Sequence, residues 1–345
     1  MTVLTLPAGP QQDSKLRPVP WRRMVWVTWR QHRPTLLSVP AVLGVVALYL
    51  LIAGLKIHRD YAALTACRPA SSSACQQLGT VFTNTDWTIS NTTLILMNFA
   101  PALIGAFAGA PVLARELETG TFRYAWTQGM RRERQAIVKL VLLGVVLAAM
   151  AGALGELFAW FFQPALQNTG MNVLAALVFD TRGLAFAAWT LVAFAIGAFL
   201  GMLIRRIVPA IAAALGVYFG LDILTWLVLR KQYPLALTTS NSSLFSGPST
   251  PSSPWALSTW YAGPGGKPAS ESVVNQVLSL FPQNGAPAVK ESLAQALAQH
   301  GITEWWRYVP VSRFWRMQFF EAGWLLILSA LLIAGTVWLV RRRAA

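Results

Sequence analysis

Six long, mostly apolar runs with few charged residues divide the chain, and more polar segments separate them. The runs cover residues 35–55, 94–113, 137–162, 184–204, 207–229 and 322–340. Each run is about 19 to 26 residues long, and roughly 20 apolar residues at a rise of 1.5 Å cross a hydrocarbon core of about 30 Å. We therefore predict an all-α polytopic membrane protein with six transmembrane helices.

The placement of Lys and Arg predicts the orientation. An even number of spans puts both termini on one side, together with the basic residues of segments 15–33, 114–139, 205–206 and 341–343. The basic residues in the short loops on the other side are only Lys56, Arg59, Arg68 and Arg182. Since cytoplasmic loops are enriched in Lys and Arg, we expect a cell-membrane protein with both termini in the cytoplasm.

The composition agrees with a membrane protein. Of 345 residues, 55% are apolar and 12% are charged, whereas soluble domains carry about 25% charged residues. The net charge of +15 fits the orientation and an attraction to anionic membrane lipid. No nucleic-acid-binding motif is present, so we expect no nucleic-acid partner.

The pattern divides the chain into four regions. Residues 1–34 form a cytoplasmic tail and an amphipathic helix, and residues 35–229 hold helices one to five. Residues 230–321 form a long extracytoplasmic segment, and residues 322–345 hold helix six and a cytoplasmic tail.

The amphipathic helix precedes the first span. Trp21 and Trp29 share one face, and Arg30 lies on the opposite, basic face. Such a pattern is typical of a helix lying in the headgroup plane, and Pro34 predicts a break before the first span. This interfacial helix serves as a docking element or only as an anchor.

Short interfacial helices are expected in the extracytoplasmic segment. Residues 238–270 are rich in Ser, Pro and Gly and should be irregular. Residues 304–324, with the sequence EWWRYVPVSRFWRMQFFEAGW, combine aromatic and Arg residues as an interfacial belt does. Glu321 should lie at the membrane surface and pair with Arg313 or Arg316.

Polar residues within the spans are candidates for function. Glu156 and Asp222 lie at membrane depth, where acids often mark a transport pathway, although each could instead bond a neighbouring helix. The small residues of segments 105–114 and 195–201 favour close helix packing. Cys67 and Cys75 share one outer loop, where they form a disulfide or remain free thiols.

No catalytic motif is recognisable. The chain lacks a phosphate-binding loop, a zinc-protease motif and a nucleophile elbow. We therefore expect no enzyme activity, no bound cofactor and no metal site in this chain.

Charge is concentrated in the segment 114–136, between spans two and three. Gly120 can end the second helix sharply, and Thr121 can cap a short helix that places Phe122 and Trp126 one turn apart. This coupling segment is suited to insertion into a groove on a cytoplasmic partner.

Three blocks of the sequence resemble the permease subunit of an ABC-2 type transporter, in its actinobacterial branch. They are WVTWRQHR at 26–33, ARELETGTFRYAWTQ at 114–128 and YVPVSRFWRMQFFE at 308–321. The resemblance implies a separate ABC ATP-binding protein, which holds ATP and Mg²⁺, and a second permease copy or paralogue. It also implies that the amphipathic helix and the coupling segment contact the ATPase, that Glu116, Glu118, Gly120 and Thr121 shape the contact, and that Phe122 and Trp126 lie near it. The outer segment would form re-entrant or interfacial helices.

Three functions remain open. The first is the membrane subunit of an ATP-driven exporter. The second is a polytopic sensor or scaffold whose charged loop binds another partner. The third is a proton-coupled secondary transporter that uses Glu156 or Asp222, although the inverted repeats common in that class are not evident.

Overall fold

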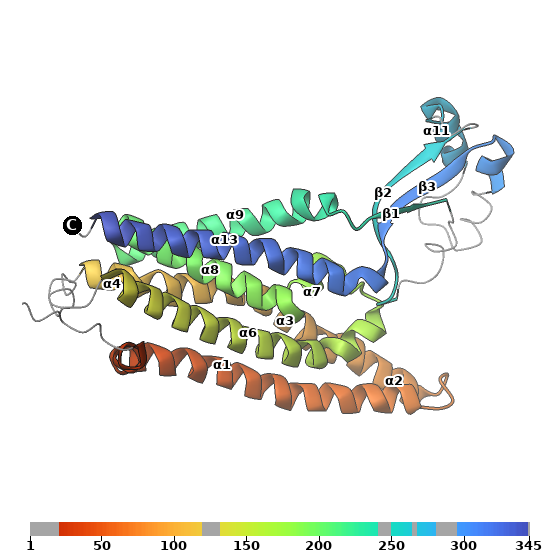
Figure 1. The fold of residues 1–345 in the computed structure, drawn as a ribbon. Helices are drawn as coiled ribbons and strands as arrows, with labels where there is room; N and C mark the ends of the chain where they lie inside the picture. Colours follow the sequence, from red (N-terminus) through yellow and green to blue (C-terminus); the bar gives the residue numbers. More distant parts are fainter. Residues whose placement is uncertain (1–20, 119–131, 241–249, 264–267, 281–294, 344–345) are drawn as a thin grey trace, which may run out of the picture.

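A bundle of long helices makes up most of the molecule, and a small β-sheet lies at one end of it (Figure 1). The computed structural model describes residues 21–118, 132–240, 250–263, 268–280 and 295–343; within these, the side chains of residues 21–39 and of a few others are not described. Helix α1 begins, and helix α13 ends, at the same end of the bundle, which we call the terminal end; the opposite end is the sheet end.

Six helices are long and apolar enough to cross a membrane, which confirms the predicted number. These candidate spans are Pro40–Ala66, Ser73–Arg115, Ala136–Thr169, Gly183–Ile204, Ile207–Gln232 and Val311–Arg342. Most extend beyond the apolar runs in the sequence because charged and polar residues continue the helices past the hydrocarbon core.

The elements follow one another as six spans, with a long segment between the fifth and the sixth. The first two spans comprise α1 (Trp21–Ala66), α2 (Ser73–Val81), the π-helical turn η1 (Phe82–Asp86), α3 (Trp87–Ile104), the π-helical turn η2 (Gly105–Gly109) and α4 (Pro111–Glu118). The next three comprise α6 (Arg132–Thr169), the short α7 (Ala176–Phe179), α8 (Gly183–Ile204), α9 (Ile207–Leu224), the π-helical turn η3 (Thr225–Leu229) and the 3₁₀ turn η4 (Arg230–Gln232). The sixth comprises the 3₁₀ turn η6 (Val311–Arg313) and α13 (Phe314–Arg343).

Helix α8 lies at the centre of the bundle. It packs against α13, α6, η2, α9, α4 and α3, and 67% of the apolar stretch within its span is buried, against 17% of that within the span that contains α9. Because α9 and α1 contribute little to the core, their outer faces remain apolar and exposed, as lipid-facing helices require.

The first helix differs from the prediction. Helix α1 continues without interruption through Pro34, so the chain forms one helix where a break was predicted. Figure 1 shows the first turns of α1 end-on while the rest of the helix runs across the view, so the helix changes direction near its start.

The segment after α9 contains β-structure that was not predicted. Strands β1 (Leu237–Thr239), β2 (Trp255–Ala262) and β3 (Thr303–Val309) form an antiparallel sheet in the order β1-β3-β2. The predicted irregular region therefore contributes β1 and β2, and part of the predicted interfacial belt is β3. The sequence TEWWRYV is rich in β-branched and aromatic residues, which favour strands as strongly as they favour a membrane surface.

A short helix lies beside the sheet in this segment, where short helices were expected. Helix α11 (Glu271–Ser279) forms where apolar residues recur at helical spacing, and it buries Val274 and Val277. These residues pack with Leu297 and Ile302 in a small core beside the sheet. The segment is thus a packed unit of strands and helix.

Candidate functional site

The base of the coupling segment is attached to the start of the fifth span. Helix α4 places the Glu118 carboxylate at the terminal end of the bundle, where its Oε2 accepts a hydrogen bond of 3.1 Å from the backbone N–H of Ile207. Ile207 is the first residue of α9, and a carboxylate at a helix N-terminus is stabilised by the helix dipole. Glu118 therefore joins α4 to α9.

A buried lysine attaches α4 to the third span as well. The Lys139 ammonium of α6 donates a hydrogen bond of 2.6 Å to the carbonyl oxygen of Val112, and the Lys139 side chain is almost fully buried. Removing a cation from water is unfavourable unless strong acceptors replace the water. The contact thus fixes α4 between α6 and α9.

Most of the predicted coupling residues cannot be placed. Gly120, Thr121, Phe122 and Trp126 lie outside the described residues. Glu116 belongs to α4, and Trp21, Trp29 and Arg30 belong to α1, but the structure describes the backbone alone at these positions. Glu118 is the predicted coupling residue whose side-chain contact is described.

Close packing of small residues connects the second span to the centre of the bundle. A Cβ atom added to Gly105 would lie 2.5 Å from the backbone of Ala193 in α8, and one added to Gly109 would lie 2.6 Å from the carbonyl oxygen of Phe194. Only glycine permits this approach of η2 to α8. The predicted packing role of the small-residue stretches is confirmed.

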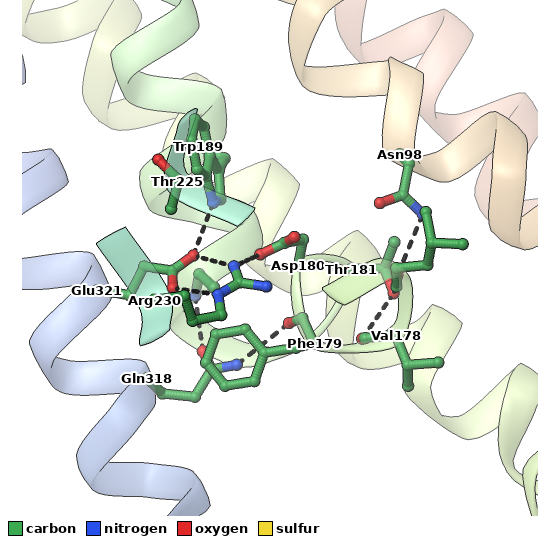
Figure 2. Close-up of polar contacts among 12 residues, drawn as sticks. Asn98, Val178, Phe179, Asp180, Thr181, Trp189, Thr225, Arg230, Gln318 and Glu321 are labelled. Carbon is green, nitrogen blue, oxygen red and sulfur yellow. Dashed lines mark hydrogen bonds and ion pairs between the residues drawn. The ribbon is translucent and has the colours of Figure 1, made fainter. Parts of the chain in front are cut away.

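At the sheet end, a buried ion-pair cluster joins three parts of the fold (Figure 2). Arg230 is 1% exposed and Glu321 is fully buried. The Arg230 Nε and Nη2 atoms donate to the two carboxylate oxygens of Glu321 at 3.0 and 2.6 Å, and Nη2 also donates to Asp180. A planar guanidinium suits this bidentate contact. The cluster therefore connects η4 to α13 and to the loop between α7 and α8.

Neutral groups complete the hydrogen bonding around Glu321. Trp189 Nε1 of α8 donates at 3.0 Å and the Tyr233 hydroxyl donates at 3.2 Å. The Arg230 guanidinium also lies 4.8 Å from the centroid of the Phe179 ring. Each carboxylate oxygen of Glu321 thus has at least two donors, which offsets the unfavourable burial of its charge.

The charges within this cluster do not balance. One guanidinium faces the two carboxylates of Asp180 and Glu321. Burial raises the pKa of Asp180 well above its ordinary value; Arg230 acts in the opposite direction and Glu321 acts in the same one. A raised pKa favours a proton on Asp180, which would leave Arg230 and Glu321 as a balanced pair.

The prediction for Glu321 is wrong. Glu321 is buried and pairs with Arg230, and its carboxylate makes no ion pair with Arg313 or Arg316 among the described residues. Arg313 instead donates to the carbonyl oxygen of Leu235 at 2.6 Å. Helix α13 begins seven residues before Glu321, so this residue faces the bundle core two turns inside the helix.

The two predicted intramembrane acids occupy separate places. Asp222 is half-buried in α9, close enough to the cluster to influence Asp180 electrostatically. Glu156 is exposed on α6 and lines a hollow with Arg182. Three residues of the cluster were not predicted as site residues, namely Asp180, Arg230 and Trp189. The sequence alone does not indicate that the end of the fifth span, the start of the sixth and the loop before the fourth lie together.

The loop between α1 and α2, at the sheet end, is cross-linked. A disulfide joins Cys67 and Cys75, whose Cα atoms are 5.7 Å apart, and it connects the end of α1 to α2. Among the described residues, no group of three or more His, Cys, Asp and Glu side chains could hold a metal ion.

The chain matches a known protein family. Residues 40–230 match the family described as ABC-2 membrane transporter related. No curated protein matches the chain. The matched region covers the first five spans and the coupling segment, whereas the blocks at 26–33 and 308–321 lie outside it. Since the match covers more than half of a chain with six membrane-spanning helices, the protein belongs to this family as an ABC-2 type transporter permease.

Proposed function

We propose that this protein is the membrane subunit of an ATP-driven exporter of the ABC-2 type. A separate ABC ATP-binding protein holds ATP and Mg²⁺ and hydrolyses the nucleotide, and a second permease copy or paralogue completes the transporter. The observation that carries the proposal is the contact of Glu118 with Ile207, since it attaches the coupling segment to a span.

The geometry suggests how a force on the coupling segment reaches the far side of the membrane. The fifth span, which comprises α9, η3 and η4, is held by polar contacts near both ends, at Ile207 by Glu118 and at Arg230 by the ion-pair cluster. Little of this span is buried between these ends. A displacement of α4 would therefore move the fifth span as a rod and load the contacts of Arg230 with Asp180 and Glu321.

The proposal also includes an orientation. The terminal end, with the coupling segment, faces the cytoplasm and the ATPase, and the sheet end faces the outside of the cell membrane. The disulfide of Cys67 with Cys75 at the sheet end is consistent with an oxidising compartment.

Co-purification in mild detergent, followed by ATP-turnover measurements, tests the proposal. The wild-type chain should retain an ABC ATPase, and Trp126→Ala should weaken that binding by roughly thirtyfold, because a lost aromatic anchor costs on the order of 2 kcal/mol. Glu118→Ala should leave the ATPase bound but reduce substrate-stimulated turnover. Glu271→Ala, which removes an exposed carboxylate at the sheet end, is the matched control.

Other outcomes would favour other functions. A bound partner without ATPase activity would indicate a sensor or scaffold. Transport that follows a proton gradient without ATP, and that is lost on Asp222→Asn or Glu156→Gln, would indicate a secondary transporter. Either result would contradict the exporter proposal.

A further inference from the structure

A polar hollow of about 630 Å³ opens at the sheet end of α6. Its walls come from α6, from the loop before α8 and from the segment after β1, and the lining residues used below are Glu156, Trp160, Gln163, Gln167, Arg182 and Ser252. The volume lies within the range of small-molecule sites, roughly 300 to 1,000 Å³. We call it the α6 hollow.

Opposite charges face the α6 hollow without neutralising each other. Glu156 and Arg182 both line it, and among the described residues neither forms an ion pair within 4.0 Å. They are nevertheless close enough to interact: burial lowers the pKa of the Arg182 guanidinium, and the Glu156 carboxylate acts in the opposite direction. Two opposite charges that line one hollow suit a ligand that carries both charges.

Arg182 has unused capacity to donate hydrogen bonds. Its Nη2 donates to the carbonyl oxygen of Ala159 at 3.1 Å, which holds the guanidinium against α6. Its Nε is buried and has no hydrogen-bond partner among the described residues. A buried donor without an acceptor is unfavourable, so a small rotation toward an anionic ligand would be stabilised.

The α6 hollow lies where the apolar span gives way to polar residues. Arg182 immediately precedes Gly183, the first residue of the fourth span, and Gln163 and Gln167 lie in the last two turns of α6. Trp160 stacks on His58 of α1 with ring centroids 4.5 Å apart. Tryptophan is enriched at the depth of lipid headgroups.

Hydrogen bonds to backbone carbonyl oxygens fix the remaining wall of the hollow, which Pro251 and Ser252 form. The Asn172 side chain donates to the carbonyl oxygen of Ser253 at 2.7 Å, and the Val173 N–H donates to that of Pro251 at 3.4 Å. These bonds hold Pro251 and Ser252 over the end of α6, so the hollow is preformed.

We propose that the α6 hollow binds a zwitterionic phosphodiester headgroup with a primary ammonium, as in phosphatidylethanolamine. The phosphate contacts Arg182, whose guanidinium matches phosphate geometry, and the ammonium contacts Glu156. Gln163 and Gln167 bond the ester and glycerol oxygens, and Trp160 forms the apolar side. The binding site is independent of the ATPase partner, so it can be tested on the purified chain whether or not the exporter proposal holds.

The experiment compares two headgroups, each as a lipid and in soluble form. Delipidated full-length chain is titrated calorimetrically with glycerophosphoethanolamine and with glycerophosphoglycerol, which lacks the ammonium. Native mass spectrometry then measures retention of phosphatidylethanolamine against phosphatidylglycerol from nanodiscs. The variants are Glu156→Gln and Arg182→Gln, with Glu271→Gln and Arg59→Gln as controls, since both control residues are exposed and outside the hollow.

The proposal expects a preference for the ethanolamine form. Glu156→Gln should abolish that preference, Arg182→Gln should weaken both headgroups by about tenfold or more, and the controls should bind as the wild type does. If Arg182→Gln fails to fold, Gln167→Trp, which fills the hollow and keeps both charges, should block binding by a similar factor. Binding of the lipid but not of the soluble headgroup identifies a membrane-lipid site; binding of both identifies a headgroup site open to water. Equal retention of the two lipids, or wild-type binding by Glu156→Gln and Gln167→Trp, would overturn the proposal.

Discussion

Replacing Arg230 by methionine should destabilise the protein more than any other single substitution in the ion-pair cluster. The change removes three hydrogen bonds, two to Glu321 and one to Asp180. It leaves the carboxyl groups of Asp180 and Glu321 without their cation, and Glu321 is fully buried. Breaking a buried ion pair by removing one partner costs about 3–5 kcal/mol, and we expect a loss of this size in the free energy of unfolding.

The choice of methionine separates the loss of charge from the loss of volume. Methionine fills much of the space of the arginine stem and adapts its shape to the neighbours, so little of the effect should come from a cavity. Glu321→Gln is the smaller perturbation, because the amide oxygen can still accept from Trp189 and Arg230; it should cost about 1–3 kcal/mol. Arg307→Met, on the exposed face of β3, should stay within about 0.5 kcal/mol of the wild type.

Unfolding in mixed micelles with increasing dodecyl sulfate, followed by circular dichroism, measures these differences. The double variant Arg230→Met/Glu321→Gln provides the decisive comparison, since it removes one of the unpaired carboxylates. It should be more stable than Arg230→Met alone, a non-additive result expected of residues in one network. If the two losses simply add, or if Arg230→Met costs no more than Arg307→Met, the cluster does not hold η4 to α13 as described.

Three further predictions concern other contacts. The stability of Asp180→Asn relative to the wild type should increase as the pH rises from about 4 to about 8. The folded protein raises the pKa of Asp180 above 3.8, so the protonated carboxyl group stabilises the wild type most below that pH and this contribution is lost as the group ionises, whereas asparagine does not titrate. A stability difference that stays constant across this range would contradict the prediction. Gly105→Ala should lower the free energy of unfolding by about 1–3 kcal/mol, because the added Cβ would lie 2.5 Å from the Ala193 backbone. Gly216→Ala should cause no such loss, because a Cβ at that position would meet no atom within 4 Å. Equal stability of the two variants would show that η2 can move away from α8. Mass spectrometry of non-reduced, alkylated protein should find Cys67 and Cys75 linked, and alkylation of both thiols would exclude the bond.

The sequence was sufficient for the membrane fold and the family. Six apolar runs determine six helices because no water is available in the bilayer to bond an exposed backbone, so each long apolar run must satisfy its own hydrogen bonds. The packing of Gly105 and Gly109 against α8 followed from the same reasoning, since close helix contact requires small residues. Both conclusions depend on local composition alone.

Predictions that required knowledge of three-dimensional neighbours were less successful. Residues 303–309 combine aromatic residues, which a membrane surface and a strand both favour, with the β-branched Thr and Val. These residues form a strand because they pair with Leu237–Thr239 and Trp255–Ala262, and the sequence does not show that pairing. Glu321 was assigned to the nearest arginines in the sequence, Arg313 and Arg316. Its partner Arg230 lies 91 positions away, and only the fold brings them together.

The π-helical turns provide a physical reason why such partners are difficult to infer. A π turn adds one residue to an α-helix, and one residue corresponds to a rotation of about 100°, so the faces of the helix on its two sides no longer align in a helical projection. Turn η3 directly precedes Arg230, and turn η1 ends at Asp86, which is fully buried against Lys56 at 2.7 Å. In both cases a charged residue next to an apolar run turns into the bundle. A regular α-helical projection does not include this rotation, so it does not show that Asp86 and Arg230 turn into the bundle at these two places.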